Sequence, residues 1–451
     1  MATVPLARWA FFPLDEELGL RPKVGFTPKM EEGMARLGTW MPFRAAQREL
    51  AFFLGVEAAE ATVRRLTEQA GSAQVQVQAA EVEALLTERP ESPAGPDVQL
   101  MSLDGALIQL VSGEWKEVKT LALGVVSEAK RKKKQAGEAQ VQTTALSYFS
   151  RMSEAESFQQ EALGELYRRG VEKAGTVCAV SDGADWIQKW VDYHRKDAVR
   201  ILDFAHAMEY VSKGGQAAQA HLALVQQGQV RSGQDPAKRQ QERFEQWLQE
   251  QRHELKTGDV AQVLAELERL RSLMQQTGHH GAVETLDKSL HYLRQRPQMT
   301  RYARFRAQGY PIGSGSVESA NKLVVQSRMK QAGMRWGPSH VNAMLAMRNL
   351  ACNDRWTEGW EAIRGMWRKQ EAARRAQRAV RPCASGKRAS PAASTVLPSP
   401  ELASSVETSR PPLTPTKPSL DHPAPPAPEP RPLRPAPTHP WRRPFIRRRS
   451  A

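Results

Sequence analysis

The stretch Val98-Gln-Leu-Met-Ser-Leu-Asp-Gly-Ala-Leu-Ile-Gln-Leu-Val111 marks the point where the hydrophobic period of the chain changes from helix-like to strand-like. A second β-like run, Val118–Val126, follows after a Ser112-Gly-Glu114 turn. Two such runs joined by a short turn that contains glycine are typical of a β-hairpin. These residues therefore predict the first two strands of a sheet, with Asp104-Gly105 following the most apolar part of the first strand.

Further strand-like runs alternate with helical patterns after the hairpin. Val141–Phe149 is a candidate third strand, Thr176–Ser181 is a short apolar strand followed directly by Asp182, and Ala198–Asp203 is the next strand. Amphipathic helical patterns separate these runs. A hairpin followed by helix, strand, helix and strand is the element order of an α/β core, and such sheets place ligands at their strand ends. We predict an α/β fold with acidic residues at those ends.

The pattern changes again after the last strand. Residues 207–300 are rich in Gln, Ala, Leu and Glu, have helical periodicity and contain no convincing strand, which predicts an all-helical insertion. Two helical stretches, 316–332 and 338–352, then resume the core. We therefore predict five regions: an N-terminal helical region with a linker at 1–97, the first part of the core at 98–210, the insertion at 211–308, the C-terminal core helices at 309–370, and a tail at 371–451.

The N-terminal region contains a pattern of three helices. Thr27-Pro28 begins the first, Phe43–Leu54 forms the second, and Glu57–Gln69 forms the third, with Gly71 as its expected end. A helix, a turn with glycine and a helix carrying Arg64 and Arg65 are typical of a helix-turn-helix DNA reader. A small helical bundle without DNA contact is the alternative that the pattern leaves open.

The positive charge of the chain is concentrated near its C-terminal end. Residues 371–451 contain 15 Lys and Arg against 5 Asp and Glu, whereas the formal net charge of all 451 residues is +15. The same segment holds 18 of the 30 prolines. So much proline is incompatible with a packed core, so we expect the tail to be disordered. The body of the chain is only mildly basic, and the total charge favours a polyanionic partner such as nucleic acid.

Cysteine usage and hydropathy indicate a protein of the cytoplasm. The only cysteines are Cys178, Cys352 and Cys383, too few and too far apart for a disulfide framework or a Cys-x-x-Cys metal site. No apolar run approaches the length needed to span a bilayer. We expect a cytoplasmic, nucleoid-associated protein without a membrane partner.

Three acidic residues stand in separate motif contexts. Asp104 and Asp182 each follow a strand-like run and precede glycine, and Glu318 follows a Gly/Ser-rich turn at the start of a helix. Taken singly, an Asp-Gly pair is more often a turn, and an acid in a first helical turn stabilises the helix dipole. Taken together, three carboxylates can hold two Mg²⁺ ions roughly 3.5–4 Å apart and support in-line phosphoryl transfer on DNA.

The chain resembles the DDE transposases of prokaryotic insertion sequences, specifically the Kra group. The resemblance covers roughly residues 11–370. It rests on seven blocks, of which the one around Glu318 is the most specific: Ser102-Leu-Asp-Gly-Ala106, Gly113-Glu-Trp-Lys-Glu-Val-Lys119, Ser181-Asp-Gly-Ala-Asp-Trp186, Leu202-Asp-Phe-Ala-His-Ala207, Tyr310-Pro-Ile-Gly-Ser-Gly-Ser-Val-Glu-Ser-Ala-Asn-Lys322, Met334-Arg-Trp-Gly337 and Asn349-Leu-Ala-Cys-Asn-Asp354.

This resemblance implies an RNase H-like catalytic domain and an acidic triad of Asp104, Asp182 and Glu318 that is both catalytic and metal-binding. It implies dependence on Mg²⁺, for which Mn²⁺ is expected to substitute. The implied partners are double-stranded DNA, as the terminal repeats of the element and as target DNA, and further copies of the chain in a homo-oligomer on DNA.

Other residues are candidates for supporting roles. Asp203 and His206 resemble the Cys/Asp-x-x-His element of transposases with a helical insertion, where it positions rather than ligates; a core histidine satisfied by a carboxylate is the alternative. A further five residues are candidates for contacts with DNA near the scissile phosphate: Lys322, Arg328, Lys330, Arg335 and Trp336. The alternatives are a solvated basic face for the cations and a core position for Trp336.

The sequence thus predicts a transposase that cleaves and joins DNA at the ends of an insertion sequence. Two alternatives remain: a metal-dependent nuclease without strand transfer, and a decayed copy that only binds DNA. Members of the family carry a cysteine-rich zinc-ribbon segment before Phe11-Phe-Pro-Leu-Asp15, and here no cysteine precedes that stretch. The Pro/Arg-rich tail is a second departure, so a truncated copy that is extended at its other end is also an expectation.

Overall fold

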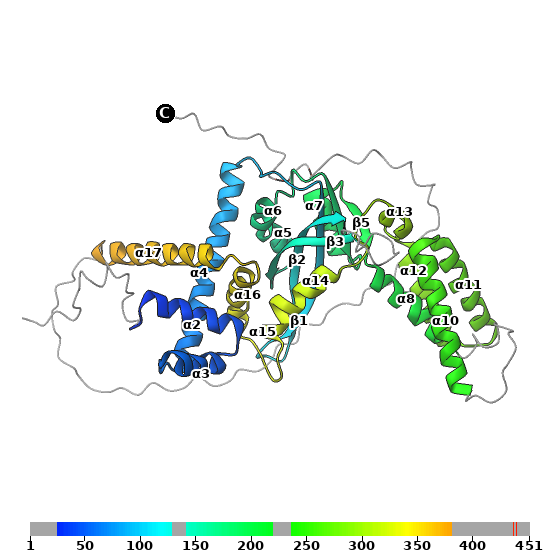
Figure 1. The fold of residues 1–451 in the computed structure, drawn as a ribbon, viewed down its shortest axis with the longest axis horizontal. Helices are drawn as coiled ribbons and strands as arrows, with labels where there is room; N and C mark the ends of the chain where they lie inside the picture. The colour runs from blue at the N-terminus through cyan, green and yellow to red at the C-terminus, as the bar shows by residue number, and fades with distance from the viewer. Residues whose placement is uncertain (1–24, 129–140, 220–235, 381–435, 437–438, 440–451) are drawn as a thin grey trace, which may run out of the picture. The chain divides into compact units, whose positions relative to one another are not determined.

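The computed structural model describes residues 25–128, 141–219, 236–380, 436 and 439 (Figure 1). Within the chain, residues 1–368 and 432–451 belong to one compact unit and residues 369–431 to another. The features described below belong to the first unit, apart from the end of the last helix.

A mixed five-stranded sheet forms the centre of the first unit. Its order is β3-β2-β1-β4-β5. β1 pairs antiparallel with β2, and β2 with β3, whereas β1–β4 and β4–β5 are parallel. The α/β class, the hairpin and the strands before Asp182 and Asp203 are confirmed. The bounds are β1 Val98–Gln109, β2 Trp115–Glu128, β3 Val141–Arg151, β4 Thr176–Ser181 and β5 Val199–Leu202.

Helices cover both faces of this sheet, because its strands carry apolar side chains on both faces. Met101 and Leu103 of β1 face α5, α6 and α7, in a core that includes Phe158 and Trp190. On the opposite face, Ile108 packs in a core with residues from α14, η1 and α16. These helices are α5 Ala155–Glu161, α6 Leu163–Arg168, α7 Asp185–Arg195, α14 Gly315–Ala320, the π-helical η1 Asn321–Gln326, α15 Ser327–Met329 and α16 Pro338–Cys352.

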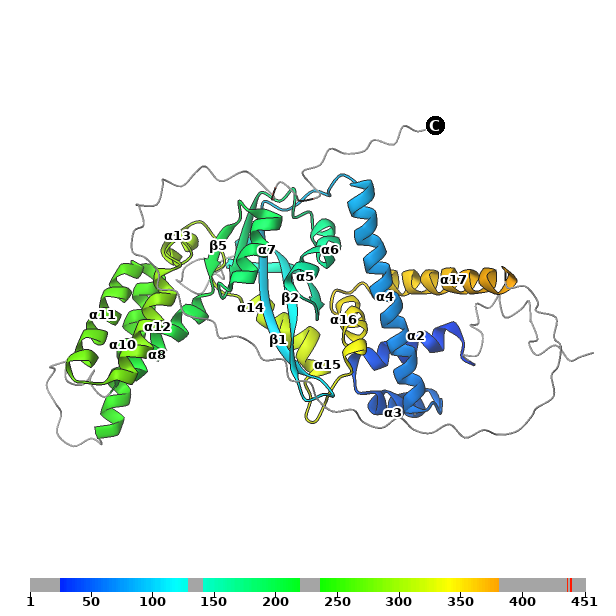
Figure 2. The ribbon, with the colours of Figure 1, turned by 180° about the vertical axis from the view of Figure 1, so that it is seen from behind.

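Residues 207–300 form helices and no strand in their described part, as the sequence predicts. Four helices lie side by side in both views (Figures 1 and 2) around buried side chains such as Trp247 and Leu267. The first begins directly after β5, earlier than the predicted boundary at 211, because Asp203 caps it. The bounds are α8 Phe204–Ala217, α10 Pro236–Thr257, α11 Val260–Gln276 and α12 His280–Arg294, followed by the short α13 Tyr302–Ala307.

The N-terminal region contains the three predicted helices, α2 Pro28–Trp40, α3 Phe43–Leu54 and α4 Glu60–Glu88. The predicted end of the third helix at Gly71 is wrong, because α4 continues through it. A Cβ atom at Gly71 would lie 2.2 Å from the carbonyl oxygen of Ala343 in α16. This glycine therefore permits a close helix crossing and does not end the helix.

The C-terminal boundary also differs from the prediction. The last helix, α17 Trp356–Val380, passes through the expected boundary at residue 370. Most of the predicted disordered tail, 371–451, lies outside the described residues. Two of its residues are placed against α7: the Ala436 N–H donates to the carbonyl of Tyr193, and the ring of His439 lies 2.9 Å from Nδ1 of His194.

Among the residues that the structure describes, no helix is both long enough and apolar enough to cross a membrane. This agrees with the hydropathy of the sequence, in which polar residues interrupt every long helical segment. α4, for example, has 29 residues but contains several Glu, Gln and Arg side chains.

Candidate active site

Asp182 directly follows the end of β4, and Asp104 lies within the neighbouring strand β1, just beyond the part that pairs with β4. The prediction that Asp104 stands at a strand end is wrong, because β1 continues to Gln109 in its pairing with β2. Ser102 of β1 is paired with Val180 of β4 in parallel register, and each aspartate stands two residues beyond its member of this pair. The Ser102 hydroxyl also donates to the Val180 carbonyl, at 2.7 Å. The two carboxylates lie close enough together for the charge of Asp182 to raise the pKa of Asp104.

The carboxylate of Asp104 is held from two directions. Its Oδ1 accepts the Gly105 N–H at 2.8 Å, and its Oδ2 accepts Nδ2 of Asn321 at 2.8 Å. Burial raises the pKa of Asp104, and the negative charge of Asp182 raises it further, against the effect of these two hydrogen bonds and of His206. A second carboxylate and a desolvated position both disfavour the charged form, so this site would gain from a cation.

Asp182 occupies a tight turn after β4. Gly183 has φ +80°, a conformation that L side chains rarely adopt. Within the turn, the Gly183 N–H donates to Oγ of Ser181 at 3.2 Å and the Ala184 N–H donates to Oδ1 of Asp182 at 2.9 Å. The turn therefore fixes both the backbone and the carboxylate of Asp182.

Asp203 and His206 form the pair that the sequence indicates. Oδ2 of Asp203 accepts both the backbone N–H of His206 at 2.8 Å and its ring Nδ1 at 3.0 Å. This hydrogen bond raises the pKa of His206 to about 9, and the charges of Asp203, Asp182 and Asp104 contribute to the increase against the effect of burial. The ring is therefore a cation at neutral pH, beside two of the three acids that the sequence singles out.

Asp203 itself stays ionised. Burial alone would raise its pKa, but the hydrogen bonds from His206 and from the backbone of Ser314 lower it below the usual value. The Ser314 N–H donates to Oδ1 of Asp203 at 2.6 Å. Asp203 thus connects the start of α8 to the Gly/Ser turn before α14 and holds that turn in position.

Glu318 is connected to this group through the same turn. Its Oε1 accepts the hydroxyl of Ser314 at 3.1 Å, while the backbone of Ser314 is bound to Asp203. Glu318 stands one helical turn before Asn321, the residue that contacts Asp104. The structure therefore brings Asp104, Asp182 and His206 together electrostatically and joins Glu318 to them through hydrogen bonds.

Asn321 is a site residue that the sequence reasoning missed. Its side chain is buried, its amide group binds Asp104, and its Oδ1 has no hydrogen-bond partner among the described residues. It is the first residue of the π-helical η1, a local geometry that is frequent at functional sites. The available signal was its spacing, since a residue three positions after Glu318 lies on the same helical face.

The donor chemistry at this site fits a hard divalent cation. Carboxylate oxygens from Asp104 and Asp182 and the unpaired amide oxygen of Asn321 are the ligand type that Mg²⁺ prefers. No group of three or more His, Cys, Asp or Glu side chains in the described parts of the chain is placed to hold one metal ion. In this conformation Glu318 is bonded to Ser314.

The candidate DNA-contacting residues fall into two groups. Arg64 and Arg65 at the start of α4 are exposed, as are Lys322, Lys330 and Arg335. Arg328 and Trp336 are 1% and 5% exposed. Nε of Arg328 donates to the Gly38 carbonyl and the indole N–H of Trp336 donates to the Met329 carbonyl, at 3.0 Å each. Arg328 thus joins α2 to the core and Trp336 packs within that core, so neither side chain is exposed to contact DNA in this structure, against the prediction.

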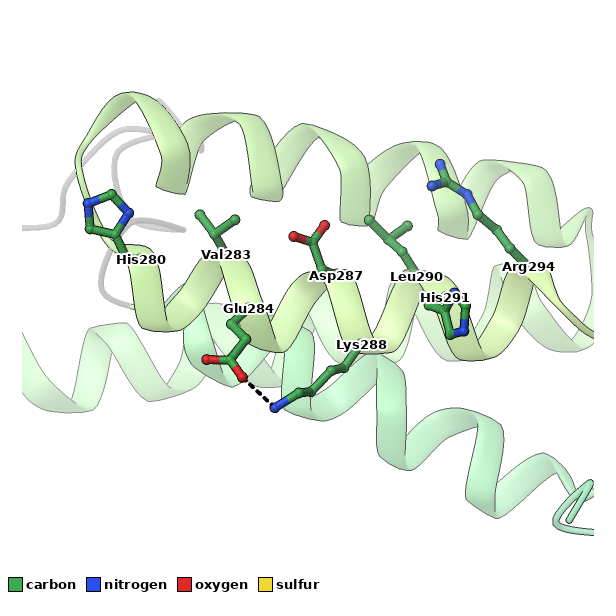
Figure 3. Close-up of a pocket in the computed structure, with 8 residues that line it drawn as sticks. All are labelled: His280, Val283, Glu284, Asp287, Lys288, Leu290, His291 and Arg294. Atoms are coloured by element: carbon green, nitrogen blue, oxygen red, sulfur yellow. Dashed lines mark hydrogen bonds and ion pairs between the residues drawn. The ribbon is translucent and has the colours of Figure 1, made fainter. Parts of the chain in front are cut away.

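A surface pocket is lined by residues of α12 (Figure 3). Its charges are largely paired: Lys288 with Glu284 at 2.7 Å, Asp287 with Arg271, and Arg294 with Glu268. None of its lining residues is an acid of the candidate site or a hydrogen-bond partner of one. The lining is His280, Val283, Glu284, Asp287, Lys288, Leu290, His291 and Arg294.

Comparison with known proteins identifies no family. No protein-family model matches the chain, and a search of curated proteins finds no match. The function is therefore inferred from the residues and their geometry.

Proposed function

We propose that this protein is a DNA transposase of an insertion sequence, with an RNase H-like catalytic domain that cleaves and joins DNA strands at the element ends. The observation that carries the proposal is the placement of Asp104 and Asp182 on adjacent parallel strands, each two residues beyond the last paired residues, Ser102 and Val180. The strand order supports the RNase H-like assignment, since an antiparallel hairpin sheet continues into two parallel strands on the side of β1.

In this proposal Asp104, Asp182 and Glu318 are the catalytic, metal-binding acids. Two Mg²⁺ ions, or Mn²⁺ in their place, would activate the attacking water or 3′-hydroxyl and stabilise the leaving 3′-oxygen. Asn321 orients the carboxylate of Asp104, and Ser314 holds Glu318 ready beside Asp203. To complete the triad, Glu318 would have to leave its hydrogen bond with Ser314 and turn toward Asp104 and Asp182.

The protonated His206 has a distinct part in this arrangement. Asp104 and Asp182 lie close enough to His206 for their negative charges to raise the pKa of its ring. Without a bound metal, the positive charge of His206 partly offsets the repulsion between the two carboxylates. His206 also fixes Asp203, which joins the turn before Glu318 to α8.

DNA binding is proposed for exposed cations at two places. Lys322, Lys330 and Arg335 are exposed on the polypeptide segment that follows Glu318. Arg64 and Arg65 are exposed on α4, and α3 with α4 supports a helix-turn-helix reader of the terminal repeats. The partner is double-stranded DNA, bound by a homo-oligomer of the chain in the nucleoid.

The experiment that tests the proposal is cleavage of DNA carrying the sequences that flank the reading frame. Wild type and Glu318→Gln are compared in Mg²⁺ and in Mn²⁺, with Glu284→Gln on the surface of α12 as the matched control. Wild type and the control should nick and join the ends, and Glu318→Gln should bind DNA normally but lose at least about a thousandfold in rate, as expected for a catalytic residue.

The products separate the proposal from its alternatives. Nicked ends without joined products would favour the alternative of a metal-dependent nuclease over a transposase. If wild type binds DNA without cleaving it, the alternative of a protein that only binds DNA would be supported. Cleavage by Glu318→Gln at the wild-type rate would remove Glu318 from the triad.

A further inference from the structure

We propose that the helical insertion braces the catalytic turn that carries Asp182, with Tyr292 and Arg296 as its positioning residues. The proposal rests on the proposed function, because it assigns these residues to the same candidate metal site. Neither residue belongs to a sequence motif that indicates catalysis.

Two backbone carbonyls of the turn accept hydrogen bonds from the end of the insertion. The phenolic hydroxyl of Tyr292 donates to the carbonyl of Asp182. The guanidinium of Arg296 donates through Nη2 to the carbonyl of Gly183 at 3.0 Å. Both donors come from a part of the chain 110 or more residues later, so the turn is held by contacts that local sequence does not supply.

The two donors are themselves fixed. The guanidinium of Arg296 lies 4.2 Å from the centre of the Tyr292 ring, and its Nη1 donates to the Tyr292 carbonyl at 2.9 Å. On its other side the Tyr292 ring is stacked on Tyr210 of α8, with centroids 3.7 Å apart and planes at 10°. Tyr292 is therefore held between a cation and a second ring, at the junction of α8 and α12.

Gly183 is matched to this brace. A Cβ atom on Gly183 would lie 2.4 Å from Nε of Arg296, in addition to the strain of the positive φ angle. The absence of a side chain here is what lets the guanidinium approach the backbone. Beyond Arg296, the Met299 carbonyl accepts the Leu202 N–H at 2.9 Å, so the chain after α12 is also attached at the end of β5.

These contacts act on Asp182 through its backbone. β4 ends at Ser181, and beyond it the carbonyls of Asp182 and Gly183 have left the strand ladder. The orientation of the carboxylate depends on the turn, since its Oδ1 accepts the Ala184 N–H. Loss of the brace should therefore loosen this hydrogen bond and misplace the carboxylate as a metal ligand, while DNA binding stays unchanged.

The test uses two conservative variants of the full chain, each with a matched control. Tyr292→Phe removes only the hydroxyl, and Arg296→Lys keeps the charge but removes the planar fork. The controls are Tyr167→Phe, which loses a similar bond to the Glu91 carbonyl, and Arg294→Lys on the surface of α12. Amide hydrogen exchange in the peptide spanning residues 182–186, Mn²⁺ affinity by calorimetry and DNA affinity are measured for all.

We expect exchange in residues 182–186 to rise about fivefold in Tyr292→Phe, as for the loss of one hydrogen bond, and by a similar factor in Arg296→Lys. Mn²⁺ affinity should fall about tenfold in both, the effect typical of residues that orient a metal ligand. The controls should match wild type in both measurements, and DNA affinity should be the same in every protein.

The proposal is overturned if exchange in residues 182–186 stays at the wild-type rate in both variants, whatever their activity. Faster exchange with unchanged Mn²⁺ affinity would also overturn it, because the brace would then be structural only. Failure of the proposed function would be seen separately, because wild type would then neither bind Mn²⁺ nor cleave DNA. In that case the exchange rates alone would test whether Tyr292 and Arg296 hold the turn.

Discussion

At the scale of single residues, the candidate site contains a cation among carboxylates. His206 is held by Asp203 and is surrounded by the charges of Asp104 and Asp182. A histidine beside ionised acids gains affinity for its proton, so its folded-state pKa of about 9 lies above the ordinary value near 6.5. The consequence is a contribution to stability that depends on pH.

The sign of this dependence follows from the raised pKa. Relative to His206→Gln, wild type should be favoured fully below about pH 6.5 and should lose the advantage as pH rises through about 9. Because 37% of the side chain is exposed, solvent screening limits the advantage to about 1 kcal/mol. Urea unfolding of both proteins in a chelator, from pH 6 to pH 10, measures it; a difference constant over that range would contradict the assignment.

At the scale of elements, the crossing of α4 and α16 depends on Gly71. Glycine within a helix costs about 1 kcal/mol relative to alanine, so its presence requires a compensating contact. That contact is the backbone of Ala343, which a Cβ atom would approach to 2.2 Å. The crossing joins the N-terminal helices to the layer that covers one face of the sheet.

Gly71→Ala should therefore destabilise the protein by about 2 kcal/mol, since the overlap outweighs the gain in helix propensity. Gly33→Ala is the matched control, because Gly33 lies within α2 and a Cβ atom there would meet nothing within 4 Å. The control should be stabilised by roughly 0.5–1 kcal/mol. Equilibrium denaturation compares the three proteins, and equal stabilisation of both variants would exclude a tight crossing.

Local periodicity predicted the elements and missed the contacts between them. The period-2 runs at 98–126 and the short apolar run before Asp182 were sufficient to place β1, β2 and β4. Asn321 could not be recognised in this way, because its partner Asp104 is 217 residues away. The end of α4 was misplaced for the same reason. Local propensity predicts that Gly71 ends the helix, whereas the close contact with α16, which is distant in sequence, explains why a glycine stands there.

At the scale of the whole molecule, charge is distributed unevenly. Most of the formal +15 lies in residues 371–451, so total charge says little about the described core. Arg64 and Arg65 are exposed at the start of α4, where the helix-turn-helix proposal places DNA. Each contact with a phosphate adds about 0.9 to the slope of log affinity against log salt concentration.

Replacing both Arg64 and Arg65 by alanine should weaken binding to the element ends and lower that slope by about 2. The matched control replaces Lys213 and Lys288, two exposed cations paired with Glu209 and Glu284, by alanine. Fluorescence anisotropy between about 50 and 200 mM salt gives both slopes. A slope unchanged by the arginine substitutions would support the alternative of a helical bundle that does not touch DNA.

The distance in sequence between Asp104 and Asn321 has a consequence for the growing chain. During synthesis, β1 with Asp104 and the turn with Asp182 leave the ribosome first, and α14 and η1, which carry Glu318 and Asn321, leave last among the site residues. N-terminal parts of a chain generally fold first as they are made. Under the proposed function, a chain built in this order would stay inert on the ribosome. An abortive fragment ending within the insertion would carry only two of the three acids and would not cut DNA.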